Sequence, residues 1–193
     1  MTKTVEFYYD FGSPASYLAY KKLGELARKK KIKINYKPIL LGGVFKAVGN
    51  QAPANIPAKG KYLFMDLKRY AKRYGVEYEF NPHFPIHTLN LMRLAIGMIQ
   101  SKDFLLLNDI LFESIWRDQL DMNGPVVIQE VLEKNKMDFK NFIDITSDPK
   151  VKEALKEATS EAVKRGVFGA PTMFFEGEMY WGQDRIFMIE EQL

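Results

Sequence analysis

The chain has 193 residues, enough for one domain or for one domain with a large insertion, and its 47% hydrophobic and 27% charged residues are typical of a globular protein. It contains no cysteine, which excludes disulfides, thiolate metal sites, a cysteine nucleophile and a dithiol redox cycle. Because it has only two histidines, we expect no metal site. A net charge of +4 is too small to indicate nucleic-acid binding, and it suits a small anionic substrate.

The N-terminal residues lead directly into an alternating strand pattern and contain no apolar run long enough for a signal peptide. No stretch approaches the ~20 apolar residues of a membrane-spanning helix. We therefore expect a soluble, cytoplasmic protein without a membrane partner.

The first forty residues predict a β-α-β unit. Residues 5–11 are apolar and aromatic, as in a buried strand. Ser13 and Pro14 then form a favoured helix start, and four cations at 28–31 suit the helix end. Residues 32–38 alternate as a second strand, so we expect a parallel pair with a right-handed crossover.

The middle of the chain predicts helices only, at residues 62–74, 89–100, 104–117, 126–134, 139–143 and 149–165. The end returns to strands at 172–175 and 179–181, followed by a short helix. This order predicts an α/β, thioredoxin-like fold with a large inserted all-helical domain. Residues 1–45 and 166–193 would form the thioredoxin-like domain, and residues 46–165 the insertion.

Ser13 has two interpretations. A serine before a helix is an ordinary N-cap. In a thioredoxin-like fold, however, the first helix begins at a catalytic Cys-Pro-x-Cys, and Ser13-Pro-Ala-Ser16 takes that place here. A helix N-terminus stabilises a thiolate. Because the chain has no cysteine, such a thiolate would come from outside, and the Ser13 hydroxyl would donate a hydrogen bond to it.

Two later segments also have two interpretations each, a plain turn or a binding element. A cis Ala170–Pro171 bond would expose the Ala170 backbone to an extended peptide, although the sequence does not show the isomer. After Gly182, backbone N–H groups at a helix start suit a carboxylate, and Asp184 suits an ammonium group.

Four motifs occur in the order found in the kappa-class glutathione transferases: Phe7-Tyr-Tyr-Asp-Phe-Gly-Ser-Pro-Ala-Ser-Tyr-Leu-Ala19, Gly49-Asn50 with Pro57-Ala-Lys-Gly-Lys-Tyr-Leu63, Phe168-Gly-Ala-Pro-Thr172 and Trp181-Gly-Gln-Asp-Arg185. Over nearly the whole chain, they resemble most that family's bacterial 2-hydroxychromene-2-carboxylate isomerase branch. The resemblance implies a DsbA-like fold and glutathione as the external thiol. It places Ser13 at the glutathione sulfur, as the catalytic residue.

The resemblance also implies five residues that bind glutathione. Asn50 lies near the tripeptide, Lys59 suits the glycine carboxylate, and the Ala170 backbone pairs with the cysteinyl unit. Gln183 and Asp184 hold the γ-glutamyl head.

The implied activity is a glutathione-dependent isomerisation of 2-hydroxychromene-2-carboxylate to trans-o-hydroxybenzylidenepyruvate, in aromatic catabolism. The thiolate adds reversibly, the ring opens, and elimination restores glutathione. One alternative is a kappa-class transferase or peroxidase that conjugates glutathione to electrophiles. Another is a non-catalytic thioredoxin-fold binding module.

The aromatic, anionic substrate has three candidate contacts, His83 and His87 in a loop and Arg93 on the following helix. For each, an exposed surface residue is the competing interpretation. The family resemblance and the aromatic-rich helical block favour a homodimer.

Overall fold

The computed structural model describes residues 2–193. Four strands form one mixed sheet in the order β2-β1-β3-β4: β1 Thr4–Tyr9, β2 Lys33–Pro38, β3 Thr172–Phe175 and β4 Glu178–Trp181. β1 and β2 are parallel, which confirms the predicted β-α-β unit, whereas β3 runs antiparallel to both β1 and β4.

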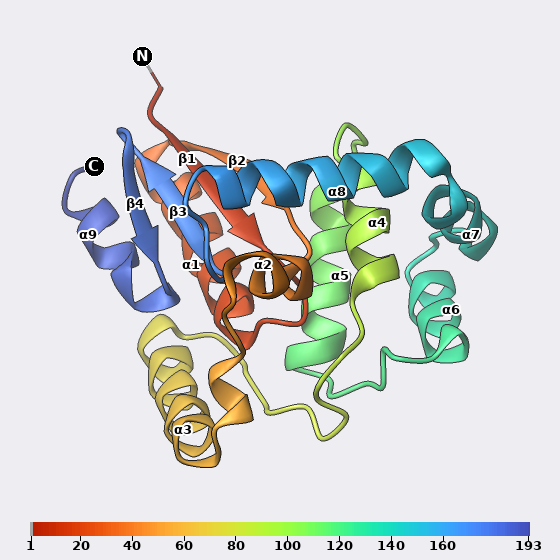
Figure 1. Ribbon diagram of the computed structural model, residues 1–193, viewed down its shortest axis with the longest axis horizontal. Helices are drawn as coiled ribbons and strands as arrows, with labels where there is room; N and C mark the ends of the chain where they lie inside the picture. Colours follow the sequence, from red (N-terminus) through yellow and green to blue (C-terminus); the bar gives the residue numbers. More distant parts are fainter. Residues whose placement is uncertain (1) are drawn as a thin grey trace.

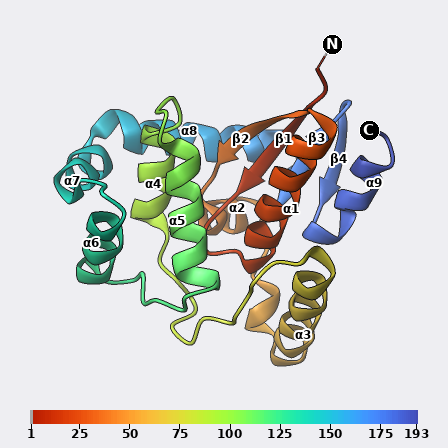
Figure 2. The same cartoon turned by 180° about the vertical axis from the view of Figure 1, so that it is seen from behind.

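The helices within residues 2–193 are α1 Pro14–Lys30, α2 Leu41–Val48, α3 Pro57–Tyr74, α4 Leu89–Gly97, α5 Phe104–Trp116, α6 Pro125–Lys134, α7 Phe139–Ser147, α8 Pro149–Lys164 and α9 Ile186–Glu190, with short 3₁₀ turns η1 Pro53–Asn55 and η2 Gln183–Arg185. All except α2 were predicted, although α3 starts earlier, α4 ends earlier and α7 ends later than expected. Helix α1 covers one face of the sheet, while α2 and α8 cover the other (Figures 1 and 2). No helix within residues 2–193 is long and apolar enough to cross a membrane.

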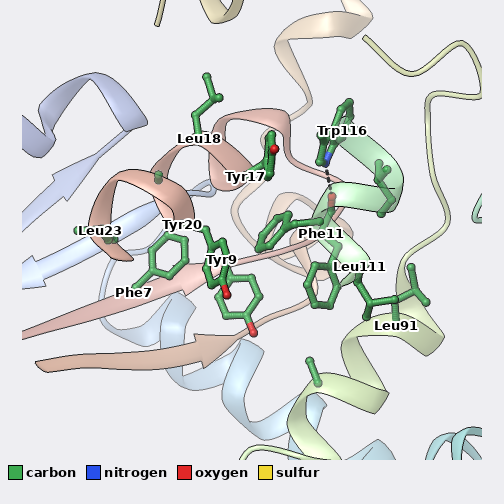
Figure 3. Packing of buried hydrophobic residues seen from close by; sticks show 14 of the residues in the cluster. Phe7, Tyr9, Phe11, Tyr17, Leu18, Tyr20, Leu23, Leu91, Leu111 and Trp116 are labelled. Carbon is green, nitrogen blue, oxygen red and sulfur yellow. Dashed lines mark hydrogen bonds between the residues drawn. The ribbon is translucent and has the colours of Figure 1, made fainter. Parts of the chain in front are cut away.

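Side chains along β1 alternate between the two faces of the sheet, and each face packs against its own layer of helices. Val5, Phe7 and Tyr9 are fully buried in the larger core, which α1 and α5 share with the sheet (Figure 3). Tyr8 points to the other face, where it packs in a smaller cluster with Val44 of α2. Because successive strand residues face opposite sides, one strand anchors both helical layers.

The helical block is part of the larger core. Trp116 of α5 is fully buried, and its indole Nε1 donates to the Phe11 carbonyl at 2.7 Å (Figure 3). This bond fixes the helical block to the loop that precedes α1. The predicted domain division stays a prediction, and its boundary at 45 and 46 falls inside α2.

The Asp10 side chain explains two of the differences from the sequence prediction. The strand expected to reach residue 11 ends at Tyr9, and helix α2 was not predicted. The carboxylate of Asp10 accepts hydrogen bonds from Gly12 N and from Leu41 N, each at 2.8 Å. It thereby turns the chain out of β1 and caps the first residue of α2 from 31 residues away.

Candidate active site

Ser13 lies at the start of α1, buried to 5% exposure, and both of its interpretations have a contact in the structure. Its hydroxyl oxygen accepts from Ser16 N at 3.1 Å, which is the helix-cap bond. The same hydroxyl donates to the Ala170 carbonyl at 2.9 Å. The serine therefore caps α1 and also joins that helix to the loop before β3.

The N-terminus of α1 is suited to an anion. Its first turn contains no acidic residue and begins with Pro14, so the partial positive charge of the helix end is not neutralised within the helix. One turn inside, the Ser16 hydroxyl is fully buried and has no hydrogen-bond partner among the described residues. The helix end therefore supplies a positive potential, whereas the Ser16 hydroxyl is buried away from solvent.

Asp10 is the part of this turn that sequence reasoning missed. Besides Gly12 N and Leu41 N, its carboxylate accepts from the Thr88 hydroxyl at 2.7 Å, and its side chain is almost fully buried. Burial raises the pKa of Asp10, and the three hydrogen bonds oppose that rise. One buried carboxylate thus joins the starts of α1, α2 and α4.

The loop before β3 faces Ser13. The Ala170–Pro171 peptide bond is cis, and the Ala170 N–H has no hydrogen-bond partner within residues 2–193. Gly182 N donates to the Pro171 carbonyl at 3.0 Å, so the Gly182 turn lies directly beside this loop. Gly182 has φ of +97°, and any side chain there would collide with the Asp184 carboxylate. The turn therefore requires glycine.

Gln183 and Asp184 extend from that turn. Tyr74, at the end of α3, donates to the Gln183 carbonyl at 2.6 Å. Gln183 is 7% exposed, and its side-chain amide forms no hydrogen bond within residues 2–193 but is not sealed from solvent. The Asp184 carboxylate contacts the Arg185 guanidinium. An incoming ammonium group would share Asp184 with Arg185.

The structure separates the two remaining predicted glutathione contacts. The Asn50 side chain follows α2 and donates to the Phe168 carbonyl at 3.0 Å, two residues from Ala170. Lys59 is exposed on the first turn of α3 and lines a cavity of about 380 Å³ with Tyr62. Fifteen residues separate Lys59 from Tyr74, roughly 22 Å along a helix. Asn50 therefore lies beside the cis-proline loop, whereas Lys59 and the Gln183 contact lie at opposite ends of α3.

The three predicted substrate contacts lie in two places. His83 and His87 are exposed in the loop before α4, where His83 Nδ1 is 3.6 Å from Asp121 and His87 N donates to Asn123. Arg93 lies on α4 and lines a separate cavity between α2, α4 and α8. The structure does not bring the histidines to that cavity.

A model of the DSBA-like thioredoxin domain matches residues 4–193. The chain belongs to the DsbA-like thioredoxin family. A solved structure described as 2-hydroxychromene-2-carboxylate isomerase superposes with a TM-score of 0.86 at 33% identity, over 98% of this chain and 93% of that one. The predicted thioredoxin-like fold with inserted helices is confirmed.

Within the DsbA-like family, two kinds of relative cover nearly the whole chain. A 2-hydroxychromene-2-carboxylate isomerase of Pseudomonas putida is 36% identical over 98% of this chain and 93% of its own length. Glutathione S-transferase kappa 1 of Rattus norvegicus is 30% identical over 95% of this chain and 88% of its own. The resemblance drawn from the four motifs is therefore confirmed.

Proposed function

We propose that this chain is a glutathione-dependent isomerase that converts 2-hydroxychromene-2-carboxylate to trans-o-hydroxybenzylidenepyruvate. One observation carries the proposal: a buried serine at a helix N-terminus without acidic residues in its first turn faces a cis-proline loop in a chain without cysteine. The full-length similarity to isomerases of that name supports the choice of reaction.

The residues at this turn fit a thiol tripeptide. Glutathione would supply a thiolate nucleophile and leave unconsumed. The Ser13 hydroxyl and the α1 N-terminus stabilise a negative charge at the sulfur position. The Ala170 N–H, which has no hydrogen-bond partner among residues 2–193, can pair with an extended backbone.

The ends of the ligand have matching groups in the proposal. Gln183 offers its side-chain amide, and Asp184 offers a carboxylate to the γ-glutamyl ammonium. Asn50 lies beside the loop that carries Ala170, and Lys59 would approach the glycine carboxylate. His83 and His87 remain proposed contacts to substrate.

An ultraviolet assay of the chromene, with and without glutathione, tests the reaction. We expect conversion only with glutathione and an unchanged concentration of free thiol afterwards, while S-methylglutathione supports no conversion because its sulfur cannot ionise. Equal conversion without thiol would contradict the proposal.

The transferase alternative is favoured by the kappa-class relatives. It predicts that free thiol falls by one equivalent for each electrophile consumed, so the same thiol measurement separates the two reactions. A binding module without catalysis predicts neither conversion nor glutathione binding at millimolar concentration in calorimetry.

Lys59 gives a second test of the site. Because it is exposed, its contact with a carboxylate is worth on the order of 1 kcal/mol, so Lys59→Ala should weaken glutathione binding about five- to tenfold in calorimetry. Lys61→Ala, two residues along the same helix and also exposed, removes the same charge and should leave the affinity unchanged. Equal affinities of Lys59→Ala and wild type would remove Lys59 from the site.

We also propose that the chain is a cytoplasmic homodimer. Exposed apolar side chains on α3 and at the C-terminal end, among them Tyr62, Met65, Trp181 and Phe187, support an association surface. Light scattering at micromolar concentration should give twice the mass of the chain.

A further inference from the structure

A second cavity lies outside the turn that carries Ser13. It has a volume of about 600 Å³ and lies between α2, α4 and α8, which face one another at the front of Figure 1. Ordinary ligand pockets have volumes of ~300–1,000 Å³. This cavity falls within that range and is large enough for a bicyclic aromatic molecule.

The charges around this cavity are strongly unequal. Four cationic side chains and one acidic side chain line it: Arg93, Lys152, Lys156, Lys164 and Glu153. Glu153 is paired with Lys156 at 2.9 Å, and within residues 2–193 the other three cations form no ion pair. Since the net charge of the whole chain is only +4, this cavity concentrates positive charge and favours an anion.

Arg93 contributes a guanidinium to this lining. Its Nη1 donates to Asn90 at 3.1 Å, which leaves Nη2 without a hydrogen bond to residues 2–193; its Nε is buried away from solvent. A guanidinium at the wall of a cavity is a strong donor to a carboxylate. Arg93 is therefore the side chain best suited to bind the charged group of a ligand there.

The rest of the lining is mostly apolar, with two hydroxyl side chains, Thr159 and Ser160. It consists largely of aliphatic side chains from all three helices: Leu40, Ala47, Leu89, Leu155 and Val163. Such a surface, beside one fixed guanidinium, suits a flat hydrophobic ring that carries a carboxylate at its edge.

The cavity is also connected to the catalytic turn. Leu40 precedes Leu41, and Leu89 follows Thr88; Leu41 and Thr88 both donate to Asp10. Asp10 in turn accepts from Gly12, the residue before Ser13. A ligand that displaces Leu40 or Leu89 would therefore move the turn that carries Ser13. The link is the hydrogen bond from the neighbouring residue to Asp10, followed by the hydrogen bond from Gly12 to Asp10.

We propose that the cavity between α2, α4 and α8 binds a planar aromatic carboxylate, with Arg93 as the group that holds the carboxylate. The ligand has the chemistry of the substrate in the proposed function, and its assignment as that substrate rests on the proposed function. The binding site itself rests on the cavity and its side chains.

The test uses 2-naphthoate as a fluorescent probe and 2-naphthamide as its uncharged analogue, both without glutathione. Arg93→Met should weaken 2-naphthoate binding at least tenfold and leave 2-naphthamide binding unchanged, whereas Arg93→Lys should restore part of the loss because it keeps the charge but not the paired donors. Arg28→Met is the matched control, since Arg28 is exposed on α1 and forms no ion pair in the described chain. It should bind both probes as the wild type does.

A second variant tests the cavity without changing charge. Ala47 lines the cavity from an exposed position on α2, so Ala47→Phe fills the apolar part with little risk to folding and should weaken binding of both probes. Unchanged 2-naphthoate affinity in both Arg93→Met and Ala47→Phe would overturn the site.

Kinetics then show whether the aromatic carboxylate that binds here is the substrate or an effector. Competitive inhibition by 2-naphthoate, with a raised KM and unchanged kcat in Arg93→Met, identifies the substrate subsite. Non-competitive inhibition, with an unchanged KM, identifies an effector site for the same chemistry. If the chain binds 2-naphthoate through Arg93 but converts no chromene, the site stands and the proposed function fails.

Discussion

Replacing Ser13 by alanine should lower turnover at neutral pH about tenfold and shift the pH–rate profile to higher pH. The variant lacks the hydroxyl that donates toward Ala170, and so lacks the donor for a bound thiolate. Loss of about 1.4 kcal/mol of preference for the ionised form raises the pKa of the bound thiol by about 1. The helix dipole remains, so activity should partly recover in alkaline solution. Ultraviolet titration of the bound thiolate measures the change directly.

A matched control separates this effect from the loss of a helix cap. Asp138 caps α7 by accepting from Lys140 N at 2.8 Å. Asp138→Ala should therefore cost about 1 kcal/mol of stability, as the loss of the Ser13 cap does, without moving the pH–rate profile. If Ser13→Ala lost stability but kept both turnover and the pKa of the bound thiol, Ser13 would be a helix cap only.

Replacing Asp10 by asparagine should destabilise the fold by about 1–3 kcal/mol at acid pH, because the side-chain amide leaves a buried N–H of Gly12 or Leu41 without an acceptor. The difference between the free energies of unfolding of Asp10→Asn and wild type should then become smaller as the pH rises. The pKa of Asp10 is higher in the folded chain than its ordinary value of 3.8. Its titration therefore contributes stability that is fully present below 3.8 and is lost as the pH rises through the folded pKa. Urea unfolding across a pH series measures this.

Thr88→Val is the control for Asp10→Asn. It keeps the carboxylate but removes the hydroxyl whose hydrogen bond lowers the pKa of Asp10. The pKa of Asp10 should rise further. The pH range over which Asp10 loses its contribution to the free energy of unfolding should therefore move upward. Parallel stability curves for wild type and Asp10→Asn would show that Asp10 does not titrate in this range.

Local rules were enough to predict the β-α-β unit and the start of α1. The aromatic alternation of β1 and the Ser13-Pro14 pair each express their structure within a few residues. Full-length motif order then identified the family. These features depend on neighbours in sequence, and a single chain displays them.

The parts that sequence reasoning missed depend on distant partners. Helix α2 contains Gly42 and Gly43 and has no side-chain cap of its own; its first N–H is bound by Asp10. Helix α3 is a local exception: it begins at Pro57 rather than 62, and the proline at its first position is a start signal that lies in the sequence itself. Arg93 was identified as a candidate, but its cavity requires α8, whose lining residues lie more than 58 positions further along the chain.

The hydrogen bond from Ser13 to Ala170 sets a threshold for what the site accepts. The hydroxyl already has a neutral carbonyl partner at 2.9 Å, so another neutral acceptor gains nothing by replacing it. An anionic acceptor does gain, because a charge-assisted hydrogen bond is roughly twice as strong. The bond to Ala170 thus makes the Ser13 hydroxyl selective for the protonation state of the ligand. A ligand that cannot ionise does not displace the Ala170 carbonyl. In the proposed glutathione site, discrimination between a thiol and its thiolate would therefore come from a bond that is already present in the ligand-free fold.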